Sequence, residues 1–432
     1  MSDKIIFKET EIGLIPEEWD NVEFGSVLLG GTRNGVYKSK EFHGAGVKII
    51  NMGELFANPR LFSIPMRRLK LTDEEFNRSS VEKGDLLFAR RSLVAEGAGK
   101  CILVCEIDEP TTFESSIIRA RPNSKIVDSR YLYYFFNSSY GEYLLNTIRR
   151  QVAVAGITGS DLVKLSIPIP SLEEQKRIAD VLEKFDQKIL INQKMIQTLE
   201  ETGQAVFKQW FAHFEFPNEE GKPYKSSGGE MVDSELGEIP KDWEIKSLDK
   251  IANYLNGLAL QKFPPEKEDY LPVIKIRELK QGVTAASDKA SSKIDPNYII
   301  DNGNVIFSWS GSLEVVLWCG GKGALNQHLF KVSSEEYPKW FYYYWTKYHL
   351  ETFRQTAADK TTTMGHIKRK DLSDALVITP SNELFSKFNK IMAPLIDLII
   401  NNNIESRNLS KTRDSLLPKL MSGKIRVSLE EK

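Results

Sequence analysis

Glu11-Ile-Gly-Leu-Ile-Pro-Glu-Glu-Trp19, near the start of the chain, returns 224 residues later as Glu235-Leu-Gly-Glu-Ile-Pro-Lys-Asp-Trp243, with five identical residues. Further pairs of segments match in the same order, at shifts that fall from 224 to about 210 along the chain: 47–55 with 271–279, 84–88 with 303–307, 131–136 with 340–345, and 169–171 with 379–381. Deletions within loops would shorten the shift in this way. An ordered series of matches indicates one domain present in two copies.

Each copy mixes strand and helix patterns, which favours α/β (α+β) globular domains. Short apolar or β-branched runs are typical of strands, as at 47–50, 85–88 and 101–104. Residues 130–147 place Leu132 and Phe136 near helical spacing, so the aromatic clusters are expected to open helices. Such aromatics could also stack on bases, but we favour packing in the core.

After Pro170, and again after Pro380, apolar residues are spaced alternately by four and three, which predicts two long paired helices. A pseudo-twofold axis between the copies would make this coiled coil antiparallel. Ser171 with Glu174 predicts a capping box at the first helix start, whereas the second keeps only Ser381. The predicted seam comprises Ile178, Leu182, Phe185, Ile189, Asn192, Ile196, Leu199, Phe388, Met392, Leu395, Ile399, Asn402, Leu409 and Leu416. A helix of about 40 residues spans about 60 Å and could act as a spacer.

Asn192 and Asn402 occupy the same seam position, near the middle of each helix. A buried Asn costs stability but fixes register, because its amide is satisfied in one alignment only. In an antiparallel pair the two midpoints fall close together. We therefore expect the two side chains within about one layer of each other, although either could instead lie at a solvated edge of the seam.

The length of 432 residues predicts more than one core. The expected organisation is domains at 1–170 and 235–380, long helices at 171–215 and 381–425, a Gly-, Pro- and Ser-rich linker at 216–234, and a tail at 426–432. The first ten residues show no apolar signal core, and the three cysteines fit a reducing compartment, so a cytoplasmic location is expected. The cysteine and histidine spacings predict no metal site.

Three motifs resemble the specificity subunits of type I restriction–modification enzymes: Gly-x-Ile-Pro-x-x-Trp opening each half, Pro-Ser-Leu-Glu-Glu-Gln-Lys-Arg-Ile at 170–178, and Leu-Pro-Lys-Leu-Met-Ser-Gly-Lys-Ile-Arg-Val at 417–427. The resemblance covers essentially the whole chain. The second copy departs from it, because Asn382-Glu-Leu-Phe385 replaces Leu-Glu-Glu-Gln at the helix start. That departure puts in doubt the docking contacts at this helix start.

The resemblance implies two target-recognition domains that each read half of a split double-stranded DNA site. It also implies two methylation subunits docked around the helices, with two restriction subunits joining to give the nuclease. S-adenosylmethionine, and ATP with Mg²⁺ for restriction, would then be bound by the partner subunits and not by this chain.

Chemistry within this chain is not expected. Adenine methylation needs an Asn/Asp-Pro-Pro-aromatic motif, and the nearest string, Asp295-Pro-Asn-Tyr298, has Asn in place of the second Pro. Gly97-Ala-Gly-Lys100 lacks the other residues of a phosphate loop. The predicted role is therefore non-catalytic. The alternatives are a stand-alone nucleic-acid-binding or scaffolding protein and, less well supported, a nuclease or methyltransferase acting alone.

Candidate DNA contacts are basic and amide side chains in loops at strand ends, because phosphate contacts give affinity and base edges give specificity. They are Arg33, Asn34, Tyr37, Lys38, Arg67, Arg68, Arg90, Arg91, Ser92, Arg149, Arg150 and Gln151 in the first copy, and Lys262, Trp309, Ser310, Ser312, Gln327, His328, Lys360, Thr361 and Thr362 in the second. Each could instead be a solvated surface group. The net charge of −1 argues against strong DNA binding by the chain alone. Because the first copy is richer in arginine, we expect more guanine in the half-site that it reads.

Overall fold

The computed structural model describes residues 6–150, 155–266, 268–359 and 365–427. Its contacts divide the chain into two compact units that do not follow the order of the sequence. Unit 1 comprises Met1–Gln187 with Ser410–Lys432, and unit 2 comprises Lys188–Leu409. Each unit therefore combines one copy of the repeat with a piece of each long helix. No helix in the described ranges is long and apolar enough to cross a membrane.

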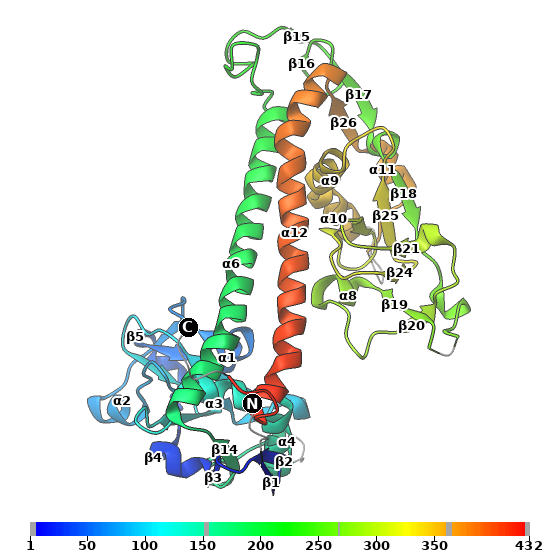
Figure 1. The fold of residues 1–432 in the computed structure, drawn as a ribbon. Helices are drawn as coiled ribbons and strands as arrows, with labels where there is room; N and C mark the ends of the chain where they lie inside the picture. The colour runs from blue at the N-terminus through cyan, green and yellow to red at the C-terminus, as the bar shows by residue number, and fades with distance from the viewer. Residues whose placement is uncertain (1–5, 151–154, 267, 360–364, 428–432) are drawn as a thin grey trace. The chain divides into compact units, whose positions relative to one another are not determined.

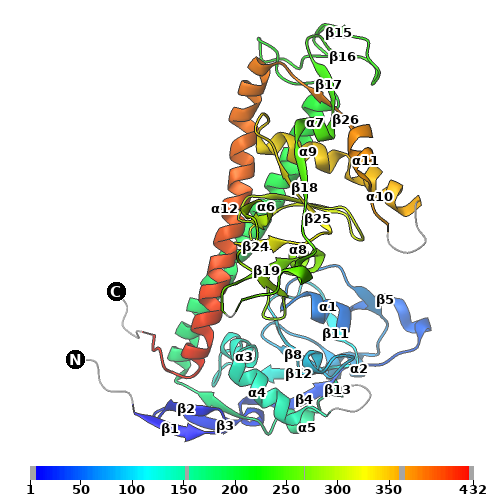
Figure 2. The ribbon, with the colours of Figure 1, turned by 90° about the vertical axis from the view of Figure 1, so that its right-hand side faces the viewer.

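The two long helices are α6 (Leu172–Phe211) and α12 (Asn382–Met421), each of 40 residues (Figures 1 and 2). Every residue of the predicted seam is buried or half-buried. Within unit 2, Asn192 contacts Glu405, and the rings of Trp210 and Phe388 stack with centroids 4.6 Å apart. Residues with higher numbers on α6 thus contact residues with lower numbers on α12. This confirms the antiparallel pairing.

Unit 1 is built on a five-stranded sheet in the order β4-β12-β8-β10-β6, beside a three-stranded sheet in the order β11-β5-β7. The strands of these sheets are β4 (Leu28–Asn34), β5 (His43–Ile50), β6 (Arg60–Leu61), β7 (Arg67–Leu69), β8 (Leu86–Ala89), β10 (Cys101–Val104), β11 (Thr111–Phe113) and β12 (Ile117–Pro122). The helices of the domain are α1 (Met52–Ala57), α2 (Asp73–Ser79), α3 (Ser129–Phe136), α4 (Ser139–Ile148) and α5 (Gly159–Leu162). The three predicted strand runs correspond to β5, β8 and β10.

Unit 2 contains two four-stranded sheets, in the orders β18-β25-β22-β23 and β20-β19-β24-β21. Their strands are β18 (Asn253–Asn256), β19 (Tyr270–Ile274), β20 (Lys289–Ser291), β21 (Ile299–Ile300), β22 (Val305–Ser308), β23 (Glu314–Leu317), β24 (Gly323–Leu325) and β25 (Leu329–Ser333). The helices are α7 (Leu248–Ile251), α8 (Ile276–Gln281), α9 (Lys339–Tyr348), α10 (Leu350–Asp359) and α11 (Arg369–Asp374).

In both units the strand after the opening motif pairs with the strand before a long helix. In unit 1, β3 (Asp20–Glu23) pairs antiparallel with β14 (Ser166–Ile169). In unit 2, β17 (Glu244–Ser247) pairs antiparallel with β26 (Leu376–Thr379). In each domain, an early strand and the last strand are therefore paired next to the start of the long helix. The opening motifs also form small hairpins, β1 (Phe7–Thr10) with β2 (Gly13–Pro16), and β15 (Met231–Val232) with β16 (Ile239–Pro240).

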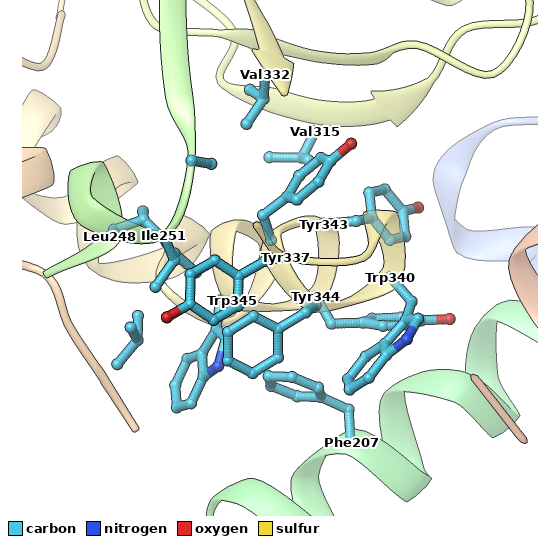
Figure 3. Close-up of a cluster of buried hydrophobic side chains, with 14 of the residues drawn as sticks. Phe207, Leu248, Ile251, Val315, Val332, Tyr337, Trp340, Tyr343, Tyr344 and Trp345 are labelled. Carbon is cyan, nitrogen blue, oxygen red and sulfur yellow. The ribbon is translucent and has the colours of Figure 1, made fainter. Parts of the chain in front are cut away.

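The aromatic clusters lie in the cores, as expected for packing. The six residues from Tyr131 to Phe136 on α3, and those from Trp340 to Thr346 on α9, are buried. In unit 2, Phe207 of α6 packs against Tyr344 and Trp345, with ring centroids 5.6 Å and 5.1 Å away (Figure 3). A long-helix side chain thus completes the core of the domain.

An ionic cluster joins the ends of unit 1. Glu174, 3% exposed, accepts a hydrogen bond from the Trp19 indole at 3.1 Å. The Arg426 guanidinium binds both oxygens of the same carboxylate at 2.5 Å and 2.9 Å, and also pairs with Glu18. The three sequence motifs therefore meet at one place, which we call the ionic junction (Glu18, Trp19, Glu174 and Arg426).

Unit 2 replaces this cluster with apolar groups. The residue equivalent to Glu174 lies 210 positions later and is Leu384. The residue equivalent to Arg426 lies 210 positions earlier and is Phe216. The Phe216 ring stacks on Trp243 with centroids 5.0 Å apart, and Leu384 packs on the same core. The departure of the second copy from the motif is therefore accompanied by a second change, at the position equivalent to Arg426. Phe216, placed at the start of the predicted linker, is buried here.

Asn192 is fully buried in the seam but only half satisfied. Its Nδ2 donates to Glu405 at 2.8 Å, while its Oδ1 and the Nδ2 of Asn402 have no partner. The hydrogen bond from Asn192, with a further contribution from Lys188, holds the pKa of Glu405 below its ordinary value. Asn192 thus meets α12 three residues beyond Asn402, and the two amides do not hydrogen-bond each other.

Asn192→Leu should raise the melting temperature by about 2 °C, because it removes a buried acceptor that has no donor. Amide exchange in α6 around residue 192 should become faster, since one polar contact that fixes register is lost. The exposed neighbour Gln193→Leu is the control and should change neither quantity. A large loss of stability in Asn192→Leu would contradict the prediction.

Arg426→Phe should lower the free energy of unfolding by about 3 kcal/mol, because it leaves the buried Glu174 carboxylate without its cation. The double variant Glu174→Leu/Arg426→Phe copies the apolar arrangement of unit 2 and should recover more than half of that loss. Urea unfolding of the wild type, Arg426→Phe, Glu174→Leu and the double variant measures both effects. Additive losses in the double variant would show that the two positions are not coupled.

Candidate nucleic-acid interface

The two units share a backbone arrangement at one edge of their sheets. In unit 1, Asn34 of β4 and Phe88 of β8 both pair with Ile118. In unit 2, Asn256 of β18 and Phe307 of β22 both pair with Phe330. In each case the two outer strands flank a central antiparallel strand, so both end at the same edge. The loops that follow them must emerge together.

The same backbone hydrogen bonds hold these loops in both units. In unit 1, Ile157 N donates to Arg90 O at 3.0 Å, and β9 (Arg91–Ser92) pairs with β13 (Ala155–Gly156). The counterpart in unit 2 is a bond of 3.1 Å from Ile367 N to Trp309 O. There Ser310 forms a β-bridge with His366. We call this arrangement the strand-end frame: residues 34, 90–92 and 155–157 in unit 1, and 256, 309–310 and 366–367 in unit 2.

A glycine follows the asparagine in each frame. Gly35 N donates to Ile117 O, and Gly257 N donates to Leu329 O. A Cβ on Gly35 would overlap the backbone of Phe113, and one on Gly257 would overlap that of the equivalent strand. Close approach of the backbone thus requires glycine at both positions. This close approach holds Asn34 and Asn256 at equivalent positions in the two units.

The side chains on the frame differ between the units. Unit 1 presents Arg90, Arg91 and Asn34. Unit 2 presents Trp309, whose indole donates to Asn256 Oδ1 at 2.9 Å and whose ring lies 5.9 Å from the His328 ring. The frame is therefore constant and the chemistry that it displays is variable.

The structure separates the arginines of unit 1 by their partners. The Arg149 side chain is 3% exposed and binds Glu142 and the Ala98 carbonyl, so it is held within the domain and cannot reach an outside ligand. Arg68 binds Glu109 at 2.7 Å. Arg150 remains 66% exposed although it pairs with Asp161 at 2.8 Å. The Thr158 hydroxyl, with Arg150 adding to its effect, holds the pKa of Asp161 below its ordinary value.

Three of the predicted arginines, Arg33, Arg67 and Arg91, are exposed and have no ion pair among the described residues. Arg91 lies in the frame, and Arg33 directly precedes its asparagine. Arg90 donates to the Ser115 carbonyl at 3.3 Å. Gly156 links two of the predicted arginine pairs, because it pairs with Arg91 and also bridges to Arg150.

Arg67 and Arg68 lie apart from the frame, in the three-stranded sheet. They line a surface hollow together with Lys40, His43, Gly44 and Met66. Sequence reasoning missed Lys40 and His43. His43, at the start of β5, pairs with Leu69 of β7, and Lys40 lies in the short 3-10 helix just before it. Tyr37 is 84% exposed, and Lys38 pairs with Glu75 at 2.5 Å.

In unit 2, Ser310 and Gln327 both contact His328, at 3.4 Å and 3.3 Å. Ser312 accepts a hydrogen bond from Lys280, and Lys262 is exposed at the end of a short 3-10 helix. Sequence reasoning missed Asn256, His366 and Arg369, although the shared Asn-Gly at 34–35 and 256–257 could have identified Asn256. Four predicted residues lie outside the described residues: Gln151, Lys360, Thr361 and Thr362.

The chain contains one α/β domain in two copies, which carry different side chains on the same frame and share an antiparallel helix pair. These features define a class of protein with two recognition modules. Comparison of the sequence with known families matches the type I restriction modification DNA specificity domain over residues 16–201 and 240–409. The chain belongs to this family.

Curated relatives agree with this assignment. The chain is 29% identical to the type I restriction enzyme MjaIX specificity subunit of Methanocaldococcus jannaschii, over 98% of this chain and 96% of that protein. It is 22% identical to the HindI specificity subunit of Haemophilus influenzae, over 81% of this chain and 88% of that protein. The crystal structure of a type I S subunit from M. genitalium has the same fold, with a TM-score of 0.56, 15% identity and coverage of 93% and 96% of the two chains.

Proposed function

We propose that this chain is the DNA-specificity subunit of a type I restriction–modification enzyme, in which each unit reads one half of a split double-stranded site. The observation that carries the proposal is the strand-end frame, which recurs in both units with different side chains. A frame of this kind positions its loops identically while the displayed groups choose the bases. The helices that both units share would set the separation of the two half-sites.

The displayed groups suit base and phosphate recognition. Arginine reads guanine with two hydrogen bonds, and asparagine does the same for adenine, so Arg91 and Asn34 could each address a base edge. In unit 2, Trp309 offers a stacking face and His328 a ring nitrogen that can hydrogen-bond. The hollow around Arg67 and Lys40 supplies cations for the phosphate backbone.

The net charge of −1 implies that partners share the work of binding DNA. We propose two methylation subunits as these partners, docked along α6 and α12, with restriction subunits joining them. S-adenosylmethionine would be bound by the methylation subunits, and ATP with Mg²⁺ by the restriction subunits. The chain itself would act by binding and not by catalysis.

Co-expression with a type I methylation subunit tests the proposal. We expect an assembly of one copy of this chain with two methylation subunits, and adenine methylation at a split motif in host DNA. Methylome sequencing, with exchange of residues 11–170 to assign the halves, should place more guanine in the half read by unit 1. A stable homomer without methylation would support a stand-alone binding protein instead, and a guanine-free first half would refute the base assignment.

Single arginine variants separate recognition from stability. In the assembled complex, Arg91→Ala should weaken binding to the mapped duplex by about tenfold with unchanged folding, because its side chain is exposed and unpaired. Arg149→Ala should lower the melting temperature instead, since it removes a buried partner of Glu142.

Fluorescence anisotropy at several salt concentrations measures the binding, and Arg78→Ala, an exposed arginine on α2, is the matched control. A phosphate contact would reduce the salt slope by about one, whereas a base contact would leave it unchanged. Wild-type affinity in Arg91→Ala would remove this residue from the interface.

A further inference from the structure

The loop that follows Arg91 in unit 1 ends in two apolar side chains that face solvent. Leu93 is 92% exposed and Val94 is 61% exposed. Burial of such a side chain away from water is favourable, and the free protein forgoes that gain at both positions. A pair of exposed aliphatic residues at a loop tip therefore indicates a surface that is covered in a complex.

The tip is held rigidly by its base. The Ser92 hydroxyl accepts a hydrogen bond from Val94 N at 3.2 Å, and Gly97 N donates to Val94 O at 3.1 Å. Gly97 is buried, and a Cβ there would overlap the Ser92 hydroxyl, so the chain can fold back only because this residue is glycine. A tip ordered before binding loses little conformational entropy when it is covered.

The surroundings of the tip are those of the DNA-facing frame. Arg91 precedes the tip and is exposed, and Arg150 lies across Gly156 from it. Two carboxylates are nearby: Asp161 is paired with Arg150, and Glu96 is exposed on the loop. Arg91 is the one cation of this group without an ion pair among the described residues. The apolar pair lies beside it, at the edge from which both strand-end loops emerge, and the proposed function assigns this edge to DNA.

Unit 2 has no equivalent tip. The strand that corresponds to β8 is β22, and it is followed by Trp309, Ser310, Gly311 and Ser312. The next residue, Leu313, is 3% exposed and belongs to the core. The apolar tip is therefore a property of unit 1 alone, and its effect should be confined to one half-site.

We propose that Leu93 and Val94 form an apolar wedge that enters the duplex at the half-site read by unit 1 and partly unstacks one base step. This inference rests on the proposed function and adds a second mode of recognition to it. Wedges of this kind kink DNA, and flexible pyrimidine–purine steps are the easiest to open. Unit 1 would then select its half-site by deformability as well as by hydrogen bonds.

The test uses the complete complex with methylation subunits and a duplex that carries the mapped motif. 2-Aminopurine replaces single bases of the first half-site in turn, excluding the methylated adenine, so that a fluorescence rise reports unstacking at that step. We expect a rise at one step with the wild-type chain. In Leu93→Ser/Val94→Ser the rise should fall by at least half and affinity should drop about tenfold. Both side chains are exposed, so folding is unaffected.

Ile126→Ser is the control, because Ile126 is another exposed aliphatic residue of unit 1, 44% exposed, outside the frame. It should leave the fluorescence rise unchanged. A double variant that binds and distorts DNA like the wild type would overturn the wedge. So would a double variant that assembles poorly with methylation subunits before DNA is added, since the tip would then be a protein contact. Failure of the wild-type complex to bind any split site would instead refute the proposed function.

Discussion

The antiparallel pairing of α6 with α12 is the interaction on which both domain cores depend. Ile178 and Leu182 of α6 join Leu417, Leu420 and Met421 of α12 in the core of unit 1. In unit 2 the same two helices contribute Phe207, Trp210 and Phe211, and Phe388, Met392, Ile396 and Ile399. In each unit these helix side chains belong to the same core as the aromatic cluster of the repeat. Segments from the middle and the end of the sequence are therefore needed by both units.

This dependence constrains how the two copies diverge. At the start of α6 a buried carboxylate is balanced by Arg426, whereas near the start of α12 the equivalent residues, Leu384 and Phe216, both pack in the apolar core. A single exchange would leave a buried charge without a partner, which is far more costly than either matched arrangement. The copies have drifted in paired steps here. The same backbone survives with two different chemistries.

The strand-end frame shows the complementary pattern. Its backbone hydrogen bonds are the same in both units, because they tie adjacent strands of a sheet whose core cannot shift. Ile157 and Ile367 of the frame belong to the cores, whereas Asn34 and Arg91 are exposed and can vary without disturbing them. Stability is thus carried by the backbone and the buried members of the frame, and the binding surface can change without loss of the fold.

The amino-acid pattern by itself determined the duplication, the two long helices with their seam, and the burial of the aromatic clusters, because these depend on periodicity along the chain. It also located the arginine pairs, but it could not rank them. Arg149 is buried against Glu142, while Arg91, which also belongs to an Arg-Arg pair, is exposed and has no ion pair among the described residues. It could not place Lys40 beside Arg67, or show that Glu174 and Arg426 meet. Only the tertiary structure decided these points, because exposure and pairing depend on which distant segments pack together.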